Sequence, residues 1–129
     1  VERYHAPGGP GVRMDSHLYS GYEVPPFYDS LLGKLIVWGP DRATAIARGR
    51  VALDELVVDG LVTNVSIHQA LLSNDAFLEG RMTTNLLDRV GSAAFLAAAP
   101  PSAKQLRPVG WTLVAATAAA AIVLIATLR

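Results

Sequence analysis

Apolar and polar side chains alternate along the segment that begins at residue 12. Successive residues of an extended chain point to opposite faces of a sheet. One face is mostly apolar and consists of Val12, Met14, Ser16 and Leu18, whereas the other is a polar row of Arg13, Asp15, His17 and Tyr19. The pattern predicts a strand with one face in a core, and Gly21 is expected to end it.

A second strand is predicted from Leu31 to Trp38, because these residues are apolar on both faces except at Lys34. Such a run suits a central strand that is covered on two sides better than an edge strand. The run Pro7-Gly8-Gly9-Pro10-Gly11 cannot be helical, since its prolines lack the amide donor and its glycines tolerate positive φ. It is typical of a tight connection between strands, and Pro25-Pro26 forces an extended or turning corner.

The first helix is predicted to start at Pro40-Asp41-Arg42, because Asp41 is a good N-cap. One apolar stripe follows it, made of Ile46, Gly49, Leu53, Leu56 and Val57. Arg48 and Arg50 lie elsewhere around the helix and are expected to form a solvated face. Gly60 is a natural stop after the helix.

A second, shorter helix is predicted through Leu72. Ser66 and Gln69 have the spacing of a capping box at its start. Asn74 and Asp75 interrupt it, and one further turn is expected up to Glu79. The fold class is therefore α+β, an antiparallel sheet on which two helices pack.

Arg13 is the candidate functional residue in the polar row. A guanidinium is planar, always charged and able to hold a carboxylate or an enolate through two hydrogen bonds. Asp15 lies on the same face two residues on and is a candidate orienting partner. The alternative is that Arg13 only pairs with Asp15 on an exposed face of the sheet.

Composition excludes several other classes of site. Eleven basic and eleven acidic residues cancel, so the chain has no charge pattern for nucleic acid. With no cysteine there is no disulfide or thiolate chemistry, which fits a cytoplasmic protein. Three scattered histidines, His5, His17 and His68, lack acidic neighbours at ligand spacing, so no metal site is predicted.

The tail has a different composition from the rest of the chain. Residues 91–108 are rich in alanine and proline and are predicted to be a linker after a first domain at 1–90. Residues 109–128 carry no charge and are predicted to form a hydrophobic C-terminal helix. Their length and Trp111 suit a membrane span, which would attach a cytoplasmic protein to a membrane. The alternatives are an alanine-rich helix buried against a partner and a C-terminus produced by a shifted reading frame.

The stretch from His5 to Trp38 resembles the start of the C-terminal subdomain of biotin carboxylase. That enzyme is the ATP-dependent component of acetyl-CoA, propionyl-CoA and pyruvate carboxylases. The resemblance rests on GGPGVR, DSH-x-Y-x-GY, VPP-aromatic-YDSL-x-GKL and DG-x-x-TN, in this order and spacing, and it fades after about Leu87.

The resemblance implies roles for four residues. Arg13 matches the family's active-site arginine, which is thought to stabilise the biotin enolate. Trp38, Arg42 and Asp59 lie in regions that resemble the family's homodimer contact. The parent enzyme uses biotin, ATP and Mg²⁺, and its other partners are the ATP-grasp half and the biotin carboxyl carrier domain.

The family's ATP-grasp half would precede Val1, and this chain contains no substitute for it. It has neither a G-x-x-x-x-G-K-[ST] loop nor a biotin-attachment Met-Lys-Met segment. The chain alone is therefore expected to bind no cofactor and to be inactive.

Three hypotheses follow from different classes. The first is the C-terminal part of a biotin carboxylase, as in acetyl-CoA carboxylase and fatty acid biosynthesis. The second is a non-enzymatic, membrane-tethered remnant or dimer partner of such an enzyme. The third is a decayed gene fragment that yields little folded protein.

Overall fold

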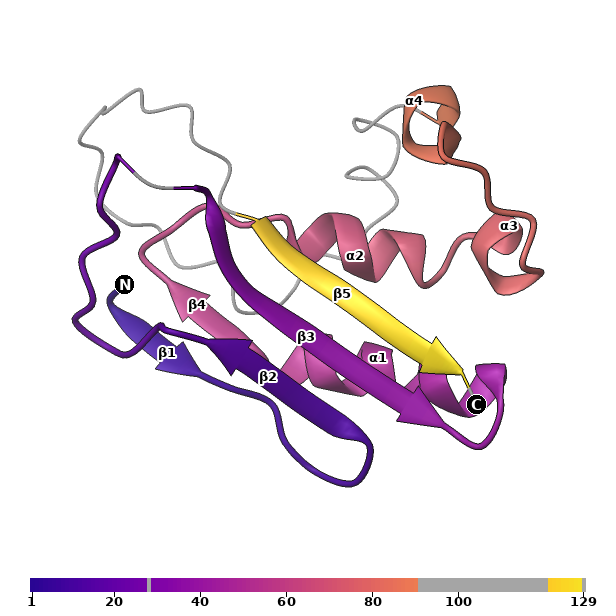
Figure 1. The fold of residues 1–129 in the computed structure, drawn as a ribbon, viewed down its shortest axis with the longest axis horizontal. Helices are drawn as coiled ribbons and strands as arrows, with labels where there is room; N and C mark the ends of the chain where they lie inside the picture. The colour runs from indigo at the N-terminus through magenta and orange to yellow at the C-terminus, as the bar shows by residue number, and fades with distance from the viewer. Residues whose placement is uncertain (28, 91–120, 129) are drawn as a thin grey trace.

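A computed structural model of the chain describes residues 1–27, 29–90 and 121–128. Five strands and four helices are found in this part of the chain (Figure 1). In chain order they are β1 (Arg3–His5), β2 (Val12–Ser16), β3 (Leu31–Gly39), α1 (Arg42–Glu55), β4 (Val57–Asp59), α2 (Val65–Leu71), α3 (Asp75–Leu78), α4 (Leu86–Val90) and β5 (Ala121–Leu128).

The strands form two small sheets. In the larger sheet β3 lies between β2 and β5, and in the smaller one β1 pairs with β4. The β2–β3 and β1–β4 pairs are antiparallel, whereas β5 runs parallel to β3. The α+β class is confirmed, but the expected single antiparallel sheet is replaced by a mixed sheet and a separate two-stranded one.

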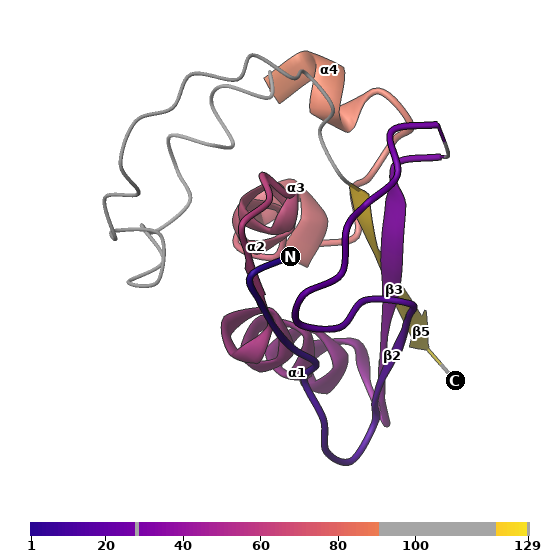
Figure 2. The same cartoon turned by 90° about the vertical axis from the view of Figure 1, so that its left-hand side faces the viewer.

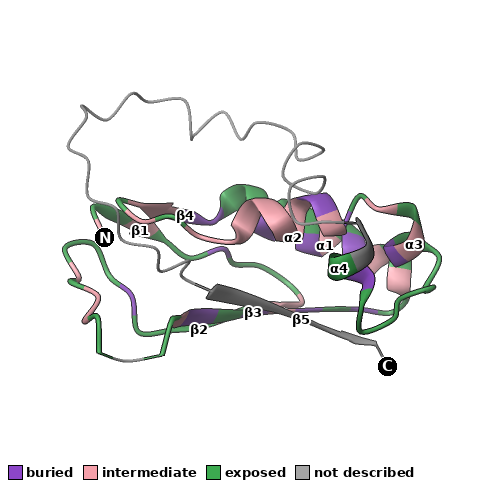
Figure 3. Cartoon of the chain, turned by 90° about the horizontal axis from the view of Figure 1, so that it is seen from above, coloured by how far each residue is buried: buried purple, intermediate pink, exposed green. Residues whose placement is uncertain are grey.

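The chain is arranged in two layers. Seen edge-on, the larger sheet has α1, α2 and α3 on one side (Figure 2). The small β1–β4 sheet lies in the same layer as α1 and α2, facing β2 and β3 (Figure 3). The larger sheet is therefore covered on one face by the other described elements.

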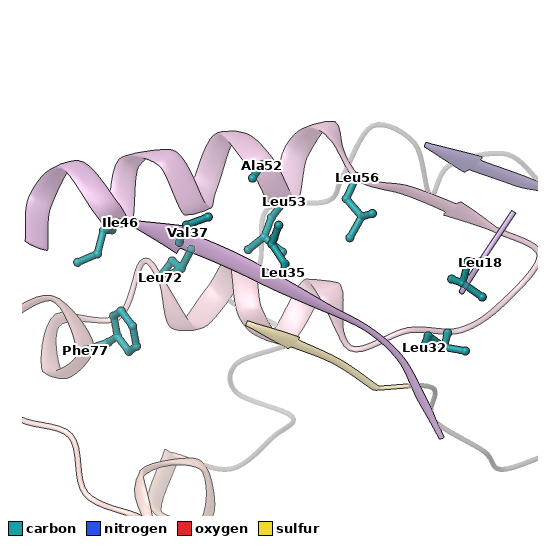
Figure 4. Packing of buried hydrophobic residues seen from close by; sticks show 10 residues of the cluster. All are labelled: Leu18, Leu32, Leu35, Val37, Ile46, Ala52, Leu53, Leu56, Leu72 and Phe77. Carbon is teal, nitrogen blue, oxygen red and sulfur yellow. The ribbon is translucent and has the colours of Figure 1, made fainter. Parts of the chain in front are cut away.

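Strand β3 and helix α1 make most of the hydrophobic core. Leu35 and Val37 of β3 are 0% and 1% exposed, and Leu53 of α1 is 1% exposed. Figure 4 shows these side chains meeting between the strand and the helix. The whole described cluster is Leu18, Leu32, Leu35, Val37, Ile46, Ala52, Leu53, Leu56, Leu72 and Phe77.

Two glycines allow α1 to approach the sheet closely. A Cβ at Gly39, the last residue of β3, would lie 2.7 Å from the backbone nitrogen of Ala45. A Cβ at Gly49 of α1 would lie 3.1 Å from Leu72 and 3.6 Å from Val37. Gly49 therefore stands in the predicted apolar stripe because the helix packs tightly there.

The helix boundaries partly follow the sequence signals. Asp41 caps α1 as predicted, because its carboxylate accepts hydrogen bonds from the backbone amide (2.8 Å) and the hydroxyl (2.9 Å) of Thr44. The capping box at Ser66 is wrong: α2 begins at Val65, so Ser66 is already inside the helix. The next helix, α3, does have a side-chain cap: Asn74 accepts hydrogen bonds from the amides of Ala76 and Phe77.

Strand β3 is central in its sheet, as predicted, but it is not covered on both faces by the described elements. Lys34 and Trp38 point away from α1, and Trp38 is 54% exposed. This outer face is the one that also carries Arg13, because Arg13 pairs with Ile36 and Asp15 with Lys34 across β2 and β3.

The predicted hydrophobic C-terminal helix over 109–128 is wrong for its last eight residues, which form β5. The β-branched residues Ile122, Val123, Ile125 and Thr127 favour a strand, and the edge of β3 supplies the backbone partner. Residues 109–120 and the linker at 91–108 lie outside the described residues. Among the helices that the structure describes, none has the length and apolar character needed to cross a membrane.

Replacing Leu35 with alanine should strongly destabilise the fold. Its side chain is fully buried between β3 and α1, and a leucine-to-alanine change in a core costs about 2–5 kcal/mol. The matched control is Val51→Ala on the exposed side of α1 (57% exposed), which should change stability by about 0.5 kcal/mol or less. Urea denaturation of both variants measures the difference, and equal midpoints would contradict this packing.

The cap at Asp41 predicts a specific acid sensitivity. Hydrogen bonds from the backbone amide and then the hydroxyl of Thr44 lower the pKa of Asp41 below its ordinary value of 3.8. A lowered folded-state pKa means that the carboxylate contributes stability above pH 3.8 and loses it as pH falls through the folded value. Asp41→Asn keeps a capping oxygen but cannot titrate, so its stability difference from wild type should shrink below pH 3.8. Denaturation at a series of pH values tests this, and a difference that does not change with pH would contradict it.

Candidate functional site

The outer face of the β2–β3 pair carries a small group of charged side chains. Arg13 Nε lies 3.1 Å from Asp15 Oδ1, and the two side chains are 69% and 50% exposed. Lys34 stands directly across from Asp15 in the antiparallel register. The carboxylate of Asp15 therefore lies beside one guanidinium and opposite one ammonium, on a face where both cations are open to solvent.

Strand β2 is fixed at its start by the glycine-rich turn. Gly9 and Gly11 have φ values of 111° and 76°, which only glycine adopts easily. The amide of Val12 donates to the carbonyl of Gly9 (3.1 Å), and the amide of Trp38 donates to the carbonyl of Gly11 (2.9 Å). The turn is therefore closed on itself and bonded to the end of β3, two residues before Arg13.

Arg48 of α1 also supports this turn, through Trp38 and next to Gly11. Its Nη1 donates to the carbonyl oxygen of Trp38 (2.7 Å), and its guanidinium lies 5.6 Å from the centre of the Trp38 ring. A Cβ on Gly11 would come within 2.4 Å of Arg48 Nη1 and 2.6 Å of the Trp38 oxygen. Gly11 is therefore required by backbone conformation and by the space that Arg48 occupies.

Arg50 is exposed, as predicted, and Arg48 is half-buried, but both arginines also have partners that the sequence did not predict. Arg50 donates through Nε (3.2 Å) and Nη2 (2.7 Å) to the carbonyl of Leu72, which ties α1 to the end of α2. Both arginines satisfy backbone carbonyls of segments distant in sequence. Helical periodicity could not reveal this, because the partners become neighbours only in the folded chain.

The far end of β2 is held by Ser16. Its hydroxyl donates to the carbonyl of Leu32 (2.7 Å) and accepts from the amide of Leu18 (3.1 Å). Beside it lies a hollow of about 300 Å³ that is lined by Asp15, Ser16, His17, Leu31, Leu32, Gly33 and Lys34. The lining therefore combines a carboxylate, an ammonium and an imidazole with two leucine side chains.

A second hollow of about 460 Å³ adjoins the first and shares His17, Leu31 and Leu32 with it. It is also lined by Tyr22, Val24, Pro25 and Asp29. The rings of His17 and Tyr22 meet edge to face, with 5.2 Å between their centres. The two hollows are therefore neighbours that have one polar and two apolar lining residues in common.

The three residues expected at a dimer contact have separate partners within the chain. Trp38 stacks with Arg48 and remains half exposed. Arg42 turns inward, because its Nη2 donates to the carbonyl of Phe77 (2.5 Å) and its guanidinium lies 5.0 Å from the Phe77 ring. Asp59 accepts from Arg3 Nε (2.8 Å) across the β1–β4 pair.

The described residues do not fit a Mg²⁺ site. No group of three or more histidine, cysteine or acidic side chains in this part of the chain is placed to hold a metal ion. The charged residues that do converge, Arg13, Asp15 and Lys34, include two cations. Such a set suits an anionic or strongly polar organic group better than a metal.

Comparison with protein families identifies this arrangement. Residues 1–89 match the family model described as the biotin carboxylase C-terminal domain. The chain is 56% identical over 89 residues to a biotin carboxylase of Pseudomonas aeruginosa and 52% identical over 90 residues to one of Nostoc sp.. These alignments cover 69% and 70% of this chain and 20% of each relative, so the chain spans about a fifth of their length.

Solved structures with the same fold belong to the same class. A biotin carboxylase from Campylobacter jejuni is 45% identical, with a TM-score of 0.66 over 68% of this chain and 20% of that one. The biotin carboxylase domain dimer of the Hydrogenobacter thermophilus 2-oxoglutarate carboxylase, in complex with MgADP, ADP and bicarbonate, is 37% identical. Its TM-score is 0.69 over 73% of this chain and 20% of that one. Since the family model covers residues 1–89 of 129, the chain belongs to the biotin carboxylase C-terminal domain family.

Proposed function

We propose that this chain acts as the C-terminal part of a biotin carboxylase, which carboxylates biotin with ATP and bicarbonate. The observation that carries the proposal is Arg13, displayed on an open sheet face by a strand that is fixed at both ends. Family membership over residues 1–89 supplies the reaction class. ATP, Mg²⁺ and bicarbonate are held, in this proposal, by the part of the enzyme that corresponds to the rest of the longer relatives.

Arg13 is the proposed catalytic residue. When biotin is carboxylated, negative charge develops on its ureido group, and a fixed guanidinium stabilises such charge more than it stabilises the neutral ground state. Asp15 is the proposed orienting partner, because its ion pair holds Arg13 Nε while the Nη atoms remain available on an exposed side chain. Both residues lie in β2, and the glycine-rich turn before it fixes the start of the strand.

The two neighbouring hollows beside Asp15 and His17 are the proposed place for the body of biotin. Leu31 and Leu32, which line both, suit an apolar ring system, and His17 and Lys34 supply polar contacts. The rest of the enzyme would close over this open face. The biotin carboxyl carrier domain is then the partner that brings the biotin.

The proposed dimer surface includes Trp38. It is half exposed beside Arg48, whereas Arg42 and Asp59 are engaged with Phe77 and Arg3. We therefore propose that Trp38 contacts the second subunit directly and that Arg42 and Asp59 support the neighbouring backbone.

Arg13→Ser should abolish most turnover without weakening nucleotide binding. A suitable enzyme is the Pseudomonas aeruginosa biotin carboxylase in which residues 1–89 of this chain replace the matching C-terminal part. Loss of one donor to developing negative charge lowers kcat about 10²–10³-fold, while ATP affinity should be unchanged. Biotin-dependent ATP cleavage and ATP titration measure the two quantities.

The matched control is Arg81→Ser, which removes an exposed arginine paired with Glu79. This variant should leave turnover and ATP affinity unchanged. Normal turnover in Arg13→Ser would exclude Arg13 as the catalytic residue. An inactive parent chimera that still binds ATP would contradict the proposed function itself.

Arg48→Ala should loosen the turn that precedes Arg13. The substitution removes the donor to the Trp38 carbonyl and the cation that stacks on the ring. A hydrogen bond to a charged group is worth about 1.5–3 kcal/mol, so exchange of the Trp38 amide, which bonds to Gly11, should be at least about tenfold faster. Arg48→Lys keeps the positive charge but not the planar guanidinium, so it should give an intermediate rate of amide exchange. Arg81→Ala is the control, and identical rates in all variants would show that Arg48 does not hold the turn.

A further inference from the structure

The outer edge of β3 needs a backbone partner. In an antiparallel pair, the residues of one strand alternately bond to the partner and point away from it. Since the Trp38 amide bonds to Gly11, the residues Ile36 and Lys34 also direct their amides toward β2. Leu35 and Val37 therefore direct theirs to the opposite edge, where β5 lies.

Strand β5 fills this edge over nearly its whole length. The parallel register runs from Leu31 opposite Ala121 to Gly39 opposite Leu128, with one irregularity between Leu31 and Gly33. Figures 1 and 2 show β5 alongside β3 on the side away from β2. An unpaired edge of this length is a template for aggregation. By pairing with β3, β5 covers the backbone groups that could otherwise pair with another chain.

The segment that forms β5 has the composition of a strand and stands apart from the family unit. Ala121–Leu128 contains no charge, proline or glycine and includes four β-branched residues, Ile122, Val123, Ile125 and Thr127. The family match ends at residue 89, and the ten residues of the main described core cluster lie between positions 18 and 77. The sheet edge and its occupant therefore belong to two separate stretches of the chain.

The length of the connection allows the occupant to behave as a ligand. Parallel neighbours need a crossover of about a dozen residues or more, and 30 residues, 91–120, separate α4 from β5. Binding of an attached segment to its own chain is intramolecular, at an effective concentration set by the connection.

We propose that the outer edge of β3 is a strand-acceptor site that binds the segment Ala121–Leu128 reversibly, in cis and when the segment is supplied in trans. Backbone bonds to Leu35 and Val37 give the affinity, as in other recognition modes where a peptide adds a strand to a sheet. The apolar end of the tail is, on this proposal, a sheet component. The proposal is independent of the role of Arg13.

The test compares two variants of the full chain by amide hydrogen exchange. Ile125→Pro removes the backbone donor that faces the Leu35 carbonyl and interrupts β5, whereas Ile125→Val is the matched control that preserves a strand. In the proline variant the Leu35 and Val37 amides should exchange at least about tenfold faster, corresponding to about 1.4 kcal/mol. The Ile36 and Lys34 amides, which face β2, should keep their protection.

The site is then refilled in trans. A synthetic peptide of residues 121–128 with two lysines added at each end should restore protection of Leu35 and Val37 in the proline variant. The same peptide with proline at the position of Ile125 should not. Unchanged exchange in Ile125→Pro, equal loss of protection at all four amides, a variant that fails to fold, or no restoration by the peptide would each overturn the proposal.

Discussion

Strand β3 is the element on which the described structure depends, because it makes three kinds of contact at once. Its inner face packs Leu35 and Val37 against α1, and its two edges bond to β2 and β5. Its outer face is left for Lys34 and Trp38. Because β3 makes all of these contacts, it must keep one register: a shift by one residue would exchange its buried and exposed faces.

The two faces of the larger sheet differ in the side chains they carry. The inner face of the sheet is apolar and contributes the burial that holds α1 in place, whereas the outer face carries the charged row around Arg13. Exposed ion pairs contribute little to stability, so the Arg13–Asp15 pair is better explained by orientation than by folding energy. The exposed position of Arg13 also leaves its guanidinium accessible to another molecule.

Arginines with backbone partners stiffen the unit from the helix side. Arg48 joins α1 to the end of β3 and to the glycine turn, Arg50 joins α1 to α2, and Arg42 joins α1 to α3. Each satisfies a carbonyl in a loop or at the end of an element, where the regular ladders leave backbone groups unpaired. The turn before Arg13 is therefore held against α1, although the two are far apart in sequence.

The sequence by itself determined the local features that depend on neighbouring residues. Alternation predicted the two faces of β2, Asp41 predicted the start of α1, and the glycine-rich motif with Arg13 indicated the family. Tertiary structure decided what depends on distant partners: the backbone carbonyls that Arg42 and Arg48 bind, the pairing of Asp59 with Arg3, and the strand at Ala121–Leu128. An apolar run of that kind suits a helix or a strand equally well by periodicity, and only the free edge of β3, a long-range backbone partner, selects the strand.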